Sequence, residues 1–336
     1  MNRALHRFTL LVTGATFVLI IAGALVTSHD AGLATSDWPL SNGQFFPRMV
    51  GNLFWEHGHR LIATTVGLLT IALVFYLHQG VLLRWLGTLL RSQALVARGE
   101  GLGEPRRWVR RLGLVALAAV IAQGLLGGLT VKLLLPLWVS SAHATLAQLF
   151  FCTMVSLSVF TSPGWNAARA AVEERETPSL RYMSAGACLL ILAQLVLGAT
   201  LRHSATWDQH LPTGLLLAHM GGALLVTVVL AAICFTTLQR HGDQPYLRRP
   251  VILAGGLLAL QLCLGVAAYV AREMSPNDPQ PLNPMVAVTV AHVACGALVF
   301  ATTIVLTLRT FQVLRIRDAR ESASPIESGN LNPQLS

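Results

Sequence analysis

Eight long apolar segments dominate this 336-residue chain and limit what it can fold into. Each is about 20 residues long, the length that an α-helix needs to cross the hydrocarbon core of a membrane. Hydrophobic residues make up 54% of the sequence and charged residues 12%, which is not typical of a soluble globular protein. The sequence therefore predicts an all-α integral membrane protein. The eight predicted transmembrane helices are residues 8–27, 58–78, 112–131, 142–161, 184–202, 218–238, 250–271 and 290–309.

The positively charged residues are distributed asymmetrically between the two ends of these helices. Of the 24 Lys and Arg residues, 19 lie in the N-terminus, in the loops that follow even-numbered helices and in the C-terminus, and 5 lie at the opposite ends. An excess of Lys and Arg marks the cytoplasmic side of a membrane protein. We therefore expect both termini in the cytoplasm. Because membrane orientation accounts for the net charge of +9, we do not interpret the charge as a nucleic-acid-binding surface.

Two short patterns repeat along the predicted helices. Even-numbered helices carry a histidine near their start, and helices 3, 5 and 7 carry a glutamine followed four residues later by a glycine. Successive pairs of outward and inward helices that carry the same two patterns indicate an internal duplication. The predicted architecture is two pseudo-symmetric four-helix bundles. The residues concerned are His59, His143, His219 and His292, with Gln123–Gly127, Gln194–Gly198 and Gln261–Gly265.

The duplication divides the chain into four predicted parts. Residues 1–161 form an N-terminal four-helix bundle and residues 184–310 form a C-terminal one. A cytoplasmic linker, 162–183, joins the bundles. The tail, 311–336, is rich in Ser, Pro and Asn and is expected to be disordered.

The repeated histidines are candidate metal ligands. The predicted topology places all four near the external ends of their helices, two in each bundle. A single histidine within a membrane commonly serves as a hydrogen-bond partner between helices, but four at equivalent places indicate a repeated site. Facing imidazoles can supply both axial ligands of a haem iron. A zinc site is less favoured because it draws on Cys, Asp or a third His, whereas a proton relay remains open.

One bundle carries a carboxylate beside its histidine and the other does not. The residues three before the repeated histidines are Glu56, Ser140, Leu216 and Thr289. Residues three apart share one face of a helix, so Glu56 lies on the face of His59. A carboxylate beside a haem can transfer protons or stabilise a developing cation. The N-terminal bundle is therefore expected to perform chemistry, with Glu56 as its catalytic residue.

Several other polar residues admit two interpretations. Glu56 could instead pair with Arg60 and stabilise the start of the helix. His57 either faces away from the site or competes with His59 as a ligand. Cations on the external side are either partners of haem propionates or ordinary interfacial charges. These cations are Arg60, Lys132, Arg202 and Arg272.

These motifs together resemble those of the haem A synthase family. The resemblance rests on Glu56-x-x-His59-Arg60, on the three later Ala-His pairs, and on Ala31-Gly32-Leu33 followed by Asp37-Trp38-Pro39-Leu40, and it covers residues 8 to about 310. It implies an enzyme of the bacterial inner membrane, an oxidoreductase that converts a ring methyl of haem O, its substrate, into the formyl group of haem A.

The resemblance also assigns roles to the candidate residues. It implies that His59 and His143 hold the substrate haem, that His219 and His292 hold a haem b cofactor, and that Glu56 is the essential carboxylate. Haem O synthase and cytochrome oxidase assembly factors are the implied partners besides lipid, and the chain is compatible with a homo-oligomer. The sequence names no electron donor.

The sequence departs from the family pattern at one pair of positions. Bacterial relatives often carry two cysteines where this chain has Thr35 and Ser41, so a thiol–disulfide role is in doubt here. Two other functional hypotheses stay open. One is a bis-histidine dihaem cytochrome that passes electrons without oxidising haem, and the other is a cofactor-free transporter with a His/Glu proton relay.

Overall fold

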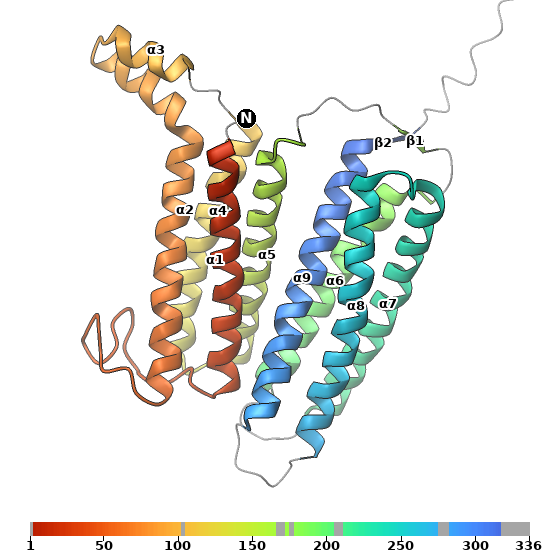
Figure 1. Cartoon of the computed structure of the whole chain (residues 1–336). Coiled ribbons are helices and arrows are strands. Elements are labelled where there is room, and N and C mark those ends of the chain that lie inside the picture. The colour runs from red at the N-terminus through yellow and green to blue at the C-terminus, as the bar shows by residue number, and fades with distance from the viewer. Residues whose placement is uncertain are drawn as a thin grey trace, which may run out of the picture.

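The computed structural model describes residues 3–101, 105–165, 172–174, 178–204, 211–274 and 282–316. Nine helices and two short strands lie within these ranges (Figure 1). Eight of these helices are long and apolar enough to cross a membrane, which confirms the predicted all-α, multi-span architecture. The elements are α1 Arg3–Ser28, α2 Asn52–Leu89, α3 Gln93–Gly101, α4 Arg107–Lys132, α5 Leu137–Thr161, β1 Val172–Glu174, α6 Leu180–Ser204, α7 Thr213–His241, α8 Pro245–Glu273, α9 Asn283–Val313 and β2 Leu314–Ile316.

The helices extend beyond the apolar segments that predicted them. Helix α2 begins at Asn52 and α9 at Asn283, six and seven residues before the apolar runs that start at 58 and 290. Hydropathy detects the part of a helix in contact with lipid, whereas the helix itself continues into the polar interface. His59 is therefore about two turns inside α2 rather than at its first residue.

Helix α3 was not predicted. The sequence predicts no helix between residues 78 and 112, yet Gln93–Gly101 is helical and packs back against the end of α2. The two helices meet closely: a Cβ atom at Gly99 would lie 2.9 Å from the carbonyl oxygen of Gly80. The contact with α2, rather than any apolar period of its own, stabilises this short helix.

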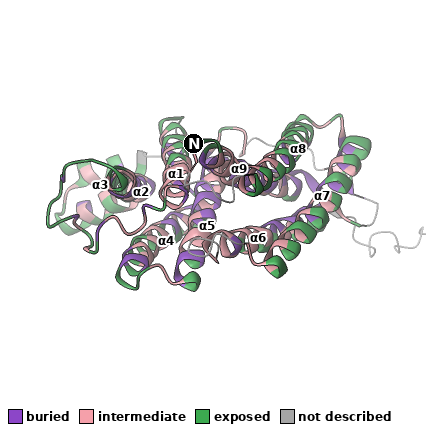
Figure 2. Ribbon diagram, turned by 90° about the horizontal axis from the view of Figure 1, so that it is seen from below, coloured by how far each residue is buried: buried purple, intermediate pink, exposed green. Residues whose placement is uncertain are grey.

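The eight long helices form two closed groups of four. In the first group, α1 and α4 each contact both α2 and α5. In the second group, α6 and α8 each contact both α7 and α9. Viewed along the helices, the outward faces are largely exposed, as lipid-facing surfaces would be (Figure 2). The pseudo-symmetry of the two groups and the predicted domain boundaries stay predictions.

Helices α5 and α9 form the centre of the molecule. They are the most buried of the long helices and contact each other, and each also contacts a helix of the opposite group. A small apolar cluster fills this junction, in which Phe17 and Phe151 stack with centroids 5.7 Å apart and Ala297 and Ala301 face them. Two of the four histidines, His143 and His292, belong to these central helices.

The C-terminal segment is ordered further than predicted. Helix α9 continues to Val313, and β2 then pairs in parallel with β1, with Val172 opposite Leu314. Residues 311–316, predicted as part of a disordered tail, are therefore regular structure. Leu314 is 1% exposed, so burial of an apolar side chain accounts for the order. The rest of the predicted tail, 317–336, lies outside the described residues.

Candidate functional site

The four predicted histidines lie toward one end of the molecule, where α2, α5, α7 and α9 begin (Figure 1). Each imidazole packs against a glycine of the preceding long helix. A Cβ atom at any of these glycines would lie 3.0–3.2 Å from the Cε1 atom of the ring, so the absence of a side chain is what makes room for the imidazole. The pairs are His59 with Gly23, His143 with Gly127, His219 with Gly198 and His292 with Gly265.

Glutamines one turn before three of these glycines contact the same histidines. Gln123 Nε2 donates to the carbonyl oxygen of His143 at 3.0 Å and lies 3.4 Å from its ring Nε2. Gln194 Nε2 donates to the carbonyl oxygen of His219 at 2.8 Å and lies 3.0 Å from its Nδ1. Gln261 Nε2 lies 3.3 Å from His292 Nε2. The glutamines thus join neighbouring helices.

The histidines are arranged as two pairs. The rings of His219 and His292 have centroids 6.4 Å apart and an interplanar angle of 75°, and His59 interacts electrostatically with His143. The buried Nδ1 atoms of His59, His143 and His292 have no hydrogen-bond partner among the described residues. Within the same ranges, no group of three or more His, Cys, Asp and Glu side chains is placed to hold a metal ion. Paired imidazoles with unpartnered nitrogens fit the two axial ligands of a haem iron.

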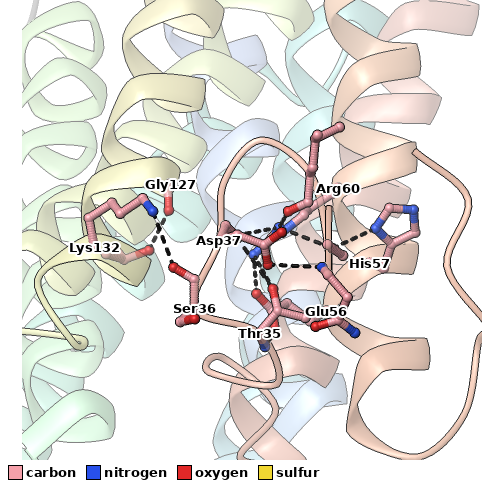
Figure 3. Close-up of polar contacts among 12 residues, drawn as sticks. Thr35, Ser36, Asp37, Glu56, His57, Arg60, Gly127 and Lys132 are labelled. Carbon is pink, nitrogen blue, oxygen red and sulfur yellow. Dashed lines mark hydrogen bonds and ion pairs between the residues drawn. The ribbon is translucent and has the colours of Figure 1, made fainter. Parts of the chain in front are cut away.

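Glu56 is buried beneath the loop that connects α1 and α2 (Figure 3). One carboxylate oxygen forms an ion pair with Arg60, and the other accepts a hydrogen bond of 2.9 Å from the backbone N–H of Thr35. The Arg60 guanidinium also donates to the carbonyl oxygens of Asp37 at 3.0 Å and Leu40 at 2.6 Å. The pairing of Glu56 with Arg60, one of the two interpretations of the sequence, is therefore present and also holds the loop.

His57 belongs to the same loop network. Its Nε2 lies 3.0 Å from the carbonyl oxygen of Phe45, and its Nδ1 lies 2.8 Å from the hydroxyl oxygen of Ser41. Because the carbonyl can only accept, Nε2 carries the proton and Nδ1 accepts from Ser41. Both ring nitrogens are therefore bound by the loop and not by the histidine pair around His59.

Thr35 and Ser41 are connected through one guanidinium. Arg60 donates to Ser41 Oγ at 3.1 Å and lies 3.5 Å from Thr35 Oγ1. Thr35 is 4% exposed and Ser41 is fully buried. At the two positions where relatives often carry cysteines, this chain therefore has hydroxyl groups that share a hydrogen-bonding partner.

Asp37 shapes the exposed turn of this loop. Its carboxylate accepts hydrogen bonds from the backbone N–H groups of Asn42 at 3.0 Å and Gly43 at 2.8 Å. These bonds favour the charged form and lower the pKa of Asp37 to about 2. Asn42 and Gly43 both have positive φ, so the carboxylate holds the turn in a conformation that few residues favour.

Replacing Asp37 by alanine is expected to loosen this turn. Hydrogen-exchange mass spectrometry would then show lower protection factors for residues 42–44. In the unchanged protein, the contribution of this carboxylate is fully present above the ordinary aspartate pKa of about 3.9 and is lost as the pH falls through about 2. Protection should therefore be constant between about pH 5 and pH 8. Asp243→Ala, at the other end of the molecule, is the control and should leave the turn unchanged.

The four candidate cations all lie at the histidine end of the helices. Arg60 is engaged by Glu56 and the loop, and Lys132 Nζ donates to the carbonyl oxygen of Ser36 at 3.2 Å (Figure 3). Arg202 donates to the carbonyl oxygen of Thr27 at 2.9 Å and so joins α6 to α1. Arg272 lies in the last turn of α8.

One member of the glycine set was missed in the sequence. Gly23 contacts His59 as the other three glycines contact their histidines, but Leu19 stands where the glutamine would be, so the Gln-x3-Gly pattern did not identify it. A search for a glycine at the same distance from the external end of the helix, whatever residue precedes it, would have found Gly23.

Comparisons with known proteins find several similar chains. The family model COX15-CtaA, a cytochrome oxidase assembly protein, matches residues 48–210, which include Glu56, His59 and His143. A heme A synthase from Symbiobacterium thermophilum is 27% identical over 78% of this chain and 85% of its own length, and one from Geobacillus kaustophilus is 24% identical over 79% and 80%. A heme A synthase from Caulobacter vibrioides is 31% identical over 46% of this chain and 40% of its own. The chain is therefore similar to heme A synthases over most of its length.

Proposed function

We propose that this protein is an enzyme of haem A biosynthesis, an oxidoreductase that converts a ring methyl of haem O to the formyl group of haem A. One observation carries the proposal: two pairs of half-buried histidines lie in one layer, and a buried carboxylate stands beside only one of the pairs. The names of the relatives, heme A synthase, support the same role.

The two pairs have different roles in this proposal. His59 and His143 hold the substrate haem in the N-terminal group of helices, and His219 and His292 hold a haem b cofactor in the C-terminal group. Haem b, when bound, supplies a one-electron carrier. The chain itself supplies the imidazoles, the glycines that make room for them, and a low-dielectric surrounding that excludes water.

Glu56 is the proposed catalytic group of the N-terminal pair. Its carboxylate is anchored by Arg60 and by the backbone of Thr35. A carboxylate held in this way can accept a proton or stabilise positive charge that develops on the reacting carbon. Its position one turn before His59 brings it to the face of the helix on which that histidine lies.

The cations at the same end are the proposed partners of the haem propionates. Lys132 and Arg202 each donate to a single backbone oxygen in the hydrogen bonds described above, and a guanidinium or ammonium has further donors for a carboxylate. Arg272 is proposed on its position at the end of α8. Arg60 is the least available of the four because the loop takes several of its donors.

The proposal is tested by identifying the pigment. The protein is expressed in membranes that contain haem O but lack another haem A synthase, and the extracted haem is identified by chromatography and mass. Haem A is the expected product, with haem b retained in the purified protein. Haem b alone, with no conversion of haem O, would instead identify an electron-passing dihaem cytochrome. Absence of any haem would overturn both and favour a transporter.

The protein is further proposed to lie in the bacterial inner membrane with both termini in the cytoplasm. The charge asymmetry supports this orientation, and the start of α1 and strand β2 lie at the same end of the molecule, opposite the start of α2 (Figure 1). Haem O synthase and cytochrome oxidase assembly factors remain its proposed partners.

Labelling tests the orientation. Phe46 is 83% exposed in the loop at the histidine end, so a cysteine there should react with a membrane-impermeant maleimide on intact cells with the outer membrane opened. A cysteine at Arg98 in α3 should react only after the inner membrane is permeabilised. The unchanged protein, whose five cysteines lie in the long helices, gives the background. The reverse pattern would refute the orientation.

A further inference from the structure

The carboxamides of three glutamines restrain three of the four histidines. Gln123 and Gln194 each bind the backbone carbonyl of their histidine and contact its ring, and Gln261 contacts the ring of His292. A partner that fixes the orientation of a ligand before it binds iron raises the affinity of the site. These glutamines touch histidines from the neighbouring helix, so they also fix the distance between the two helices.

His59 has no such restraint. In α1 the equivalent position is Leu19, four residues before Gly23, and a leucine cannot hydrogen-bond to an imidazole. The buried Nδ1 atoms of His59, His143 and His292 all lack a hydrogen-bond partner among the described residues, but the rings of His143 and His292 each contact a glutamine through Nε2. The N-terminal pair therefore contains one restrained and one unrestrained histidine, whereas both histidines of the C-terminal pair are restrained.

The positions of the helices do not explain why His59 alone lacks a glutamine partner. Helices α2 and α7 both lie away from the central α5 and α9, and both carry a histidine that packs on a glycine (Figure 2). His219 of α7 is restrained by Gln194, but His59 of α2 is not. The glutamine contact, and not a place at the edge of the molecule, distinguishes the two.

We propose that this difference determines which haem the protein keeps and which it exchanges. Gln194 and Gln261 are positioning residues that retain the haem of the C-terminal pair, and His59 is the ligand that releases the haem of the N-terminal pair. A substrate must enter and a product must leave, whereas a cofactor must stay. The inference rests on the proposed function, because it requires that both pairs hold haem.

Haem transfer to an excess of apomyoglobin measures this property on the purified full-length protein. Two phases are expected for the unchanged protein, a fast one from the N-terminal pair and a slow one from the C-terminal pair. Gln194→Leu and Gln261→Leu should each accelerate the slow phase about 10–100-fold, the usual effect of losing a partner that orients a metal ligand. Leu19→Gln, which offers His59 a carboxamide, should slow the fast phase.

A matched control and a spectroscopic readout separate positioning from general destabilisation. Gln148 is a buried glutamine of α5 that forms no hydrogen bond to any of the four histidines among the described residues, so Gln148→Leu should leave both phases unchanged. Gln194→Leu should also shift the low-spin electron paramagnetic resonance signal of the retained haem while the protein elutes as a single monodisperse peak.

The outcomes are distinguishable from those of the proposed function. If the purified protein holds two haems but Gln194→Leu and Gln261→Leu both exchange at the unchanged rates, the inference is wrong and the proposed function stands. If Leu19→Gln does not fold, the exchange rates of Gln194→Leu and Gln261→Leu still test the inference. If the purified protein binds no haem, the proposed function fails together with the inference.

Discussion

Glu56→Gln is expected to abolish haem A formation while haem O, or a partly oxidised intermediate, accumulates. Glutamine keeps the shape of the side chain, and its one oxygen can still accept a hydrogen bond from either Thr35 or Arg60, but its NH2 group only donates, and the side chain carries no charge and cannot take up a proton. Loss of general acid–base catalysis typically lowers a rate about 10²–10⁴-fold, and loss of electrostatic stabilisation adds to this. Chromatography of haem extracted from membranes that express the variant gives the measurement.

The competing role of Glu56 is structural, as an anchor of the loop through Arg60. Under that role Glu56→Gln would stay active, whereas Glu56→Ala and Arg60→Ala would both lower the protein yield. Glu174→Gln is the matched control, because Glu174 is also a buried carboxylate but lies at the opposite end, where it accepts from Ser179 and Leu180 at the start of α6. Normal haem A production by Glu56→Gln would end the catalytic assignment.

His219→Ala or His292→Ala is expected to remove the low-spin haem signal of the C-terminal pair. The two rings lie 6.4 Å apart across the C-terminal helices, and loss of either leaves one ligand where two are needed. The haem-to-protein ratio of the purified variant, with its reduced-minus-oxidised spectrum, measures the loss. Acidification should also release haem, because a ligating imidazole must be neutral.

The control for this prediction is another histidine in a long helix. His78 lies in α2 at the opposite end, where its Nδ1 donates a hydrogen bond to the carbonyl oxygen of Val74. His78→Ala should therefore keep the full haem content. Full haem content in both His219→Ala and His292→Ala would show that these residues are not ligands.

The sequence predicted the long helices correctly because lipid imposes a simple requirement on them. About 20 apolar residues are needed to cross the membrane, and each such segment is visible in the sequence. The ends of the helices, α3 and the β1–β2 pair were not predicted, because they depend on contacts between distant residues. Val172 and Leu314, for example, are paired although 142 residues separate them.

The candidate site was predictable where a pattern repeats and not where it depends on one loop. Four histidines in equivalent places were visible in the sequence, and the structure packs each on a glycine. The connection from Arg60 to Thr35, Asp37 and Ser41 was not visible, because no periodicity relates a loop to the helix beneath it.

The pairing of β1 with β2 has a consequence for the order in which the chain assembles during synthesis. Strand β1 leaves the ribosome before any residue of α6–α9, but its partner is made last, 142 residues later. At about 5–20 residues per second, β1 waits roughly 7–30 s for β2. During that time α1, α2, α4 and α5 can already pack together, whereas the second group of helices can close only after α9, which ends at Val313, has been made.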